Sequence, residues 1–209
     1  MKKCKSLVLG CILTVLALPL TGAVTDASAQ NVIVNPGFES GDLTGWEVAG
    51  GNSVATVTVQ SPDNGPTLPG TNNAFLNNLG EAIGLNLKQS TAPGTAAPGN
   101  VDYSFDLKLD EAAIGGVVFV QMFAEQDGVG IVGGSGLLGP LWPWNVWTTY
   151  TGSFTAPAGT DFLTIRFEAA TGADIGTSSV LHVDNVILAQ PGVGATEPSS
   201  LSNVKALYR

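Results

Sequence analysis

The clearest pattern in the chain is a strict alternation of apolar and polar residues in several short stretches. Residues 54–60 and 162–169 alternate with a period of two, and residues 103–109 carry Tyr, Phe, Leu and Leu at odd positions and Ser, Asp and Lys at even ones. This period puts alternate side chains on opposite sides of a β-strand, so each stretch predicts a strand with one core face and one wet face. Residues 116–125 are more continuously apolar, which predicts a central strand buried on both faces.

Clusters of glycine, proline, asparagine and aspartate separate these stretches, as in residues 61–66, 92–100 and 156–159. Such clusters favour turns and loops. No long stretch after residue 29 carries a convincing helical period. We therefore predict an all-β sandwich of about eight to ten antiparallel strands.

Residues 1–29 have the features of a secretory signal peptide. Three lysines precede an apolar run over residues 7–20, and Ala27–Ala29 supplies the small residues that signal peptidase needs. The run is too short to span a bilayer as a helix, so we expect no membrane insertion. We expect cleavage after Ala29 and secretion from a bacterial cell. The alternative is a lipoprotein signal, because Val8–Cys11 is similar to a lipobox.

The end of the chain differs in character from the predicted sandwich. Residues 191–198 read as a linker, and residues 199–209 fit a short helix with a serine cap. The predicted organisation is a signal peptide (1–29), one sandwich domain (30–190), and a linker with a short tail (191–209). The tail is either a frayed end or a docking element for the cell surface or the secretion machinery.

Cysteine content and charge exclude several classes of function. Cys4 and Cys11 both lie in the predicted leader, so the mature chain has no disulfide, thiol nucleophile or thiolate metal site. Without the leader, 5 basic and 16 acidic residues remain, a formal net charge of −11. This charge repels phosphate backbones, so we expect no nucleic-acid partner. It suits calcium, which prefers carboxylate and carbonyl oxygens.

Two motifs stand near the ends of the predicted domain. Asn35–Trp46 has the form N-P-G-F-E-x-G-x-x-x-G-W, and Val183–Leu188 has the form V-D-N-V-x-L. Together they resemble the carbohydrate-binding modules of families four and nine, which are galactose-binding-like β-sandwiches. The resemblance covers residues 31–189 and implies a jelly roll that binds a polysaccharide or oligosaccharide. It also implies a structural calcium held by Glu39 and Asp184, with loop carbonyls around Asn52. The alternative is that Glu39 only accepts hydrogen bonds from turn amides.

The candidate ligand-binding residues come from the chain itself. Trp142 and Trp144 alternate with proline after a glycine-rich loop, and two indoles held outward can stack on the apolar faces of sugar rings. The alternative is that they cap an edge of the sandwich. Trp46 and Trp147 match structural aromatic positions of the family. Strand alternation turns three further polar side chains outward as weaker candidates: Gln121, Arg166 and Glu168.

Catalytic motifs are not convincing in this chain. Gly128–Gly133 has the spacing of a dinucleotide-binding turn, but no helix or acidic partner follows it. Ser135 lacks the context of a nucleophile elbow, and His182 is the only histidine. We predict a secreted, non-catalytic carbohydrate-binding module. The alternatives are a structural or adhesive surface protein and, third, a small secreted enzyme. The sequence does not determine the glycan or the oligomeric state.

Overall fold

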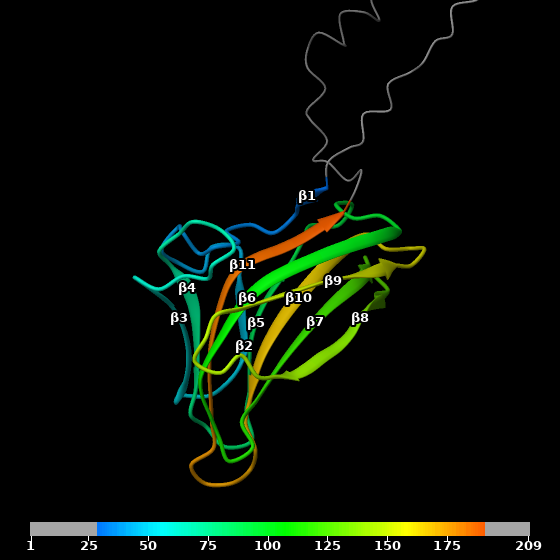
Figure 1. The fold of residues 1–209 in the computed structure, drawn as a ribbon. Coiled ribbons are helices and arrows are strands. Elements are labelled where there is room, and N and C mark those ends of the chain that lie inside the picture. Colours follow the sequence, from blue (N-terminus) through cyan, green and yellow to red (C-terminus); the bar gives the residue numbers. More distant parts are fainter. Residues whose placement is uncertain (1–28, 191–209) are drawn as a thin grey trace, which may run out of the picture.

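The computed structural model describes residues 29–190, which form eleven strands and no helix. Figure 1 shows the two layers of the resulting sandwich, with β6 and β11 side by side in one layer and β7 and β10 in the other. The strands are β1 (Gln30–Asn31), β2 (Glu47–Gly50), β3 (Ala55–Gln60), β4 (Asn73–Asn78), β5 (Gly84–Ser90), β6 (Gly99–Ala113), β7 (Val117–Gln126), β8 (Gly130–Leu141), β9 (Thr148–Ala156), β10 (Phe162–Ala170) and β11 (Ser178–Gln190).

The strands pair antiparallel in two sheets. The six-stranded sheet has the order β3-β4-β11-β6-β9, and β1 also pairs with β11. The five-stranded sheet has the order β2-β5-β10-β7-β8. Neighbouring strands are often distant in sequence, as in a jelly roll. The predicted antiparallel β-sandwich is confirmed.

The core lies between the sheets and contains the apolar side chains of the alternating strands. Phe105 and Phe167, one from each sheet, are fully buried and meet edge-to-face with ring centroids 5.3 Å apart. Trp46 packs on Phe38 and Phe167, and its indole nitrogen donates to the carbonyl of Asn35. The opening motif therefore contributes two aromatic side chains, Phe38 and Trp46, to this core.

Two details of the predicted strands are wrong. β7 is not buried on both faces: Val118, Val120 and Met122 point inward, while Phe119 and Phe123 are only half-buried on the outer side. On β6, Asp106 does face away from the core, but it is completely buried rather than wet. The connection between β3 and β4, residues 61–72, lies over the outer face at this point; we call it the strap.

Some sequence predictions fall outside the described residues. The signal peptide up to residue 28, the lipobox and the tail over 191–209 are among them. No membrane-spanning helix is present in the part of the chain that the structure describes.

Candidate functional site

The outer face of the five-stranded sheet brings the predicted sheet-face residues together. Gln121 on β7 lies directly opposite Arg166 on β10, and Arg166 also lies opposite Lys88 on β5. The Arg166 guanidinium donates to Gln121 Oε1 at 3.2 Å and approaches Glu168 Oε2 at 3.5 Å. All three predicted residues therefore belong to one polar ladder across the middle of the sheet.

Aromatic rings flank this ladder on the same face. The guanidinium carbon of Arg166 lies 5.4 Å from the centroid of the Phe123 ring, a cation–π contact that holds both groups in place. Phe119 lies opposite Glu168, and Phe119 and Phe123 are separated by four residues, about 13 Å along a strand. Half-buried rings beside hydrogen-bonding groups are the two components with which proteins contact sugars. We call this surface the open face.

Sequence reasoning missed both phenylalanines. The run of residues 116–125 carries too few polar residues to reveal which side of the strand is exposed. The polar residue Gln121 indicates which side of this strand is exposed, because Phe119 and Phe123, two positions before and after it, must lie on the same face. Lys88 and Glu47, an ion pair with a separation of 3.3 Å on the neighbouring strands, extend the polar part of this surface.

Trp142 and Trp144 lie elsewhere, in the connection from β8 to β9. They are 55% and 45% exposed, and their rings are nearly parallel with centroids 5.8 Å apart. Between them Pro143 is buried, its carbonyl accepts a hydrogen bond from Leu109 N–H of β6, and Asn145 N–H donates to the Leu109 carbonyl. The loop is therefore anchored while its two indoles remain accessible. Among the described residues, no hydrogen bond, ion pair or ring contact joins this pair to Gln121, Arg166 or Glu168.

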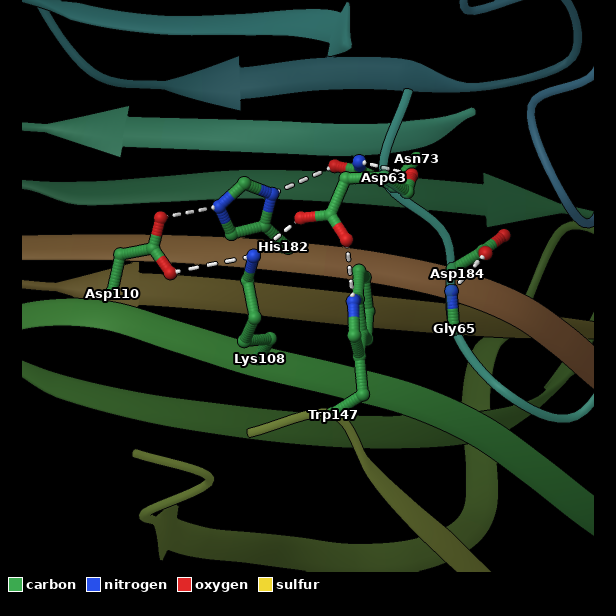
Figure 2. Close-up of polar contacts among 8 residues, drawn as sticks. All are labelled: Asp63, Gly65, Asn73, Lys108, Asp110, Trp147, His182 and Asp184. Atoms are coloured by element: carbon green, nitrogen blue, oxygen red, sulfur yellow. Dashed lines mark hydrogen bonds and ion pairs between the residues drawn. The ribbon is translucent and has the colours of Figure 1, made fainter. Parts of the chain in front are cut away.

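The outer face of the six-stranded sheet is covered instead of open, because the strap is fixed to it by carboxylates. Gly65 N–H donates to Asp184 Oδ2 at 2.7 Å (Figure 2). Thr67 donates to Asp106 through both its backbone nitrogen and its hydroxyl, at 2.9 and 2.7 Å. Asp106 and Asp184 are 0% and 1% exposed, so these bonds are made away from water.

A polar network fixes the first part of the strap to the same sheet (Figure 2). Asp63 pairs with Lys108 and accepts a hydrogen bond from the Trp147 indole nitrogen at 2.9 Å. These contacts lower the pKa of Asp63 although burial opposes them. Trp147 therefore lies outside the core, as a structural residue of the covered face.

His182 belongs to this covered network. Its ring nitrogens lie 2.8 Å from Asn73 Oδ1 and 2.7 Å from Asp110 Oδ2. Burial lowers the pKa of His182, while the hydrogen bond and charge of Asp110 raise it. The side chain is 3% exposed, so it cannot meet a substrate.

Glu39 and Asp184, the predicted calcium ligands, both accept hydrogen bonds from the strap. Glu39 Oε1 accepts hydrogen bonds from the backbone of Thr71 at 2.8 Å and of Asn72 at 2.9 Å, which is the alternative role weighed for this residue. Asp184 accepts from Gly65 and from its neighbour Asn185. Burial raises the pKa of Asp184 to about 7, and the charges of nearby acids add to this shift.

The position of Asn52 contradicts the expectation that its loop supplies carbonyl ligands. The Asn52 carbonyl accepts from Ala55 N, and its side chain lies near Gly80, beyond the end of β4. Asn78 pairs with Ser179, five residues along β11 from Asp184, a separation of about 17 Å in an extended strand. The turn between β2 and β3 is therefore at the wrong end of the sheet.

The donor set for a cation is limited. Within residues 29–190, no three His, Cys, Asp or Glu side chains gather where they could hold a metal ion. Oxygen atoms do converge near Gly37: a β-carbon there would lie 3.5 Å from Asp184 Oδ1 and 3.6 Å from Asn185 Oδ1, beside the Glu39 side chain. These hard oxygens fit calcium, provided that backbone carbonyls complete the shell.

Comparison with known proteins defines the fold. No family model and no curated protein matches this chain. Among solved structures, the enzymatically active domain of a bacteriophage CBA120 tailspike protein matches with a TM-score of 0.58 and 16% identity, over 76% of this chain and 21% of that one. A family 16 carbohydrate-binding module matches with a TM-score of 0.50 and 17% identity, over 77% of this chain and 100% of the module.

The match to a family 4 carbohydrate-binding module is weaker, with a TM-score of 0.46 and 17% identity over 76% of this chain and 99% of the module. The match to the family 16 module shows that the two chains share a β-sandwich fold. The specific resemblance to families four and nine is not confirmed. The chain spans only about a fifth of the tailspike domain.

Proposed function

We propose that this protein is a non-catalytic carbohydrate-binding module that holds a polysaccharide or oligosaccharide on the open face. The observation that carries the proposal is the arrangement of Phe119 and Phe123 around the Gln121–Arg166 pair. Phenyl rings offer flat apolar surfaces to the C–H faces of sugars, and the guanidinium and amide groups suit hydroxyl groups. Arg166 is already oriented by three neighbours, which lowers the entropic cost of binding.

Trp142 and Trp144 form a second candidate contact for the same ligand. Two exposed, mutually stacked indoles on an anchored loop expose apolar area that the core does not use. We assign them a supporting role, because the open face combines rings with hydrogen-bonding groups and the loop pair does not.

The binding test uses the purified protein on a glycan array, followed by retention in gels that contain the polysaccharides that score. Phe119→Ala with Phe123→Ala should abolish retention, and Trp142→Ala with Trp144→Ala should weaken it. Val48→Ala on the edge strand β2 is a matched control for losing an exposed apolar side chain. If no glycan is retained, the adhesive role replaces this proposal; if only the tryptophan variant loses retention, the site lies on the loop.

We also propose a structural calcium ion bound by Glu39 and Asp184. Its charge would stabilise the ionised form of Asp184 and tie the start of the domain to β11. The strap amides engage Oε1 of Glu39, while Oε2 has only a long contact of 3.5 Å from the Thr71 hydroxyl, which a cation could replace. Asn185 Oδ1 and nearby carbonyls are the further donors.

A calcium ion that binds only the folded state stabilises it by about 2.7 kcal/mol at a hundredfold excess over the dissociation constant. EDTA should therefore lower the melting temperature, and Asp184→Ala should abolish this sensitivity. Glu47→Ala, which removes an exposed carboxylate on β2, should leave it intact. If EDTA does not change the melting temperature, the calcium proposal is wrong, and Glu39 only accepts hydrogen bonds from the strap.

Secretion after cleavage behind Ala29 is part of the proposal. The first strand begins at Gln30, directly after this site, so cleavage there would leave the described fold complete. Intact-mass measurement of the exported protein should give a chain that starts at Gln30. A mass that fits a lipidated Cys11 would contradict both the cleavage site and the secreted location.

A further inference from the structure

The strap contains the single Asn-Gly pair of the chain, Asn64–Gly65. Gly65 is buried, and a β-carbon on it would lie 2.5 Å from Asp106 Oδ2 and 2.9 Å from Asn185 Nδ2. Packing therefore requires glycine at position 65, since any side chain would displace buried hydrogen-bonded groups. An asparagine that precedes a glycine is, however, prone to deamidation.

Asparagine followed by glycine can lose its side-chain amide without an enzyme. The backbone nitrogen of the glycine attacks the Asn Cγ, a new N–C bond closes a five-membered succinimide, and ammonia leaves with the proton of that N–H. Water then opens the ring at either carbonyl, giving aspartate or isoaspartate. The net reaction consumes one water and releases one ammonia.

In the folded protein, hydrogen bonds of the strap keep the Gly65 nitrogen from attacking the Cγ atom of Asn64. Gly65 N–H donates to the buried Asp184 Oδ2 at 2.7 Å, and the Asn64 amide nitrogen donates to the Gly65 carbonyl at 2.9 Å. Contacts hold the strap on both sides: the Asp63 side chain pairs with Lys108, and the Thr67 N–H donates to Asp106. The nitrogen can reach Cγ only after these contacts break and the local backbone rotates.

We propose that Asn64 is a deamidation site protected by the closed strap, so that its conversion records strap opening. The conversion is one-way. The succinimide lacks the N–H that Asp184 binds; hydrolysis restores this N–H but adds a carboxylate at residue 64, next to Gly65, which already donates to the buried Asp184. Isoaspartate also lengthens the backbone by one carbon, so the contacts of Asp63 and Thr67 on either side can no longer all form as they do in the closed strap.

The test follows deamidation of the purified full chain at mildly alkaline pH, by intact mass and by peptide mapping of Asn64. The urea-unfolded protein should convert at least about tenfold faster than the folded protein, the ratio that a local opening free energy of about 1.4 kcal/mol produces. Lys108→Gln should accelerate conversion several-fold in the folded protein and leave the unfolded rate unchanged, because it removes the ion pair of Asp63 and so weakens the attachment next to Asn64. Thr67→Val loosens the other side and serves as a second, milder variant.

Asn64→Gln is the control, because glutamine would need a larger ring and converts far more slowly. The melting temperature of the wild-type protein should fall during incubation, and that of Asn64→Gln should stay constant. Equal rates in the folded and unfolded protein, or no response to both Lys108→Gln and Thr67→Val, would overturn protection by the strap. No conversion of Asn64 in the unfolded chain would overturn the site itself.

Discussion

The two outer faces of this sandwich are built from similar alternating strands, yet they differ in what happens to their polar side chains. On the five-stranded sheet, Arg166 and Glu168 remain partly exposed beside half-buried rings. On the six-stranded sheet, the strap buries Asp106 and Asp184 and uses each of them as a hydrogen-bond acceptor. One face leaves polar side chains partly exposed, and on the other face the carboxylates accept hydrogen bonds from the strap backbone.

Outward-facing polar residues that look alike in the sequence therefore have different roles on the two faces. A buried carboxylate with several donors stabilises the fold because its loss leaves those donors without partners. An exposed side chain on a flat face contributes little to stability, so a well-ordered one is available for binding. Substitutions on the covered face should therefore act on folding, and those on the open face on affinity.

Asp106→Ala should give the largest loss of stability. Asp106 accepts four hydrogen bonds: two from Thr67, one from Thr149 and one from Asn185. Its removal leaves buried donors unpaired, and we expect about 3–5 kcal/mol of destabilisation, or roughly 10 °C in melting temperature. Asp102→Ala, on the same strand but exposed, is the control and should change stability by less than about 0.5 kcal/mol. Similar losses of stability in Asp106→Ala and Asp102→Ala would contradict the special role of the carboxylate that the strap buries.

The alternation of the strands predicts which side of each strand faces the core, and the structure agrees for residues 103–109 and 162–169. What the alternation cannot predict is whether the opposite side meets water or another segment. Asp106 and Arg166 occupy equivalent outward positions. Only the tertiary course of residues 61–72 makes one buried and the other accessible, and turn-forming residues specify where a chain bends rather than where it docks.

The candidate site shows the same limit. Arg166, Gln121 and Glu168 were predicted from alternation alone and do share a face. The phenylalanines beside them were hidden in an apolar run, where composition points to burial. Family resemblance pointed to Glu39 and Asp184, which do lie near one another, but it could not place the turn at Asn52.

The stability of the covered face should depend on pH through Asp184. Burial raises the pKa of Asp184 from 3.8 to about 7, so the folded state binds this proton more tightly than the unfolded state. The stabilisation is complete below pH 4 and is lost as the pH rises to 7, by up to about 1.4 kcal/mol per pH unit. Metal-free protein should therefore melt at a higher temperature at pH 5 than at pH 8.

Comparison with Asp184→Asn isolates this effect, since asparagine keeps an acceptor for Gly65 N–H but does not titrate. His182 acts in the opposite direction, because its lowered pKa makes acid destabilising. The difference between the two proteins at each pH removes that contribution. A difference that does not change between pH 5 and 8 would contradict the raised pKa of Asp184.

Arg166→Met should affect binding and leave folding nearly unchanged. Methionine keeps apolar contact with Phe123 but removes the charged donor, and hydrogen bonds to charged groups contribute about 1.5–3 kcal/mol. We expect a corresponding loss of glycan affinity, measured by titration calorimetry, with stability altered by less than about 1 kcal/mol. Lys88→Met changes a neighbouring cation on the same face and controls for charge. An equal loss of affinity in both variants would indicate general electrostatic attraction instead of a specific contact.

The tryptophan pair should also have only a small effect on stability. Because Trp142 and Trp144 are half-exposed and stack on each other, removing either ring forfeits their mutual contact, about 0.5–1.5 kcal/mol. Removing the second ring then has no stack left to break, so the double alanine variant should be hardly less stable than either single variant. Thermal melts of the four proteins measure this coupling directly. Additive losses of many degrees would mean that each indole separately caps the sandwich edge, and the open face would then be the only ligand surface among the described residues that our proposal retains.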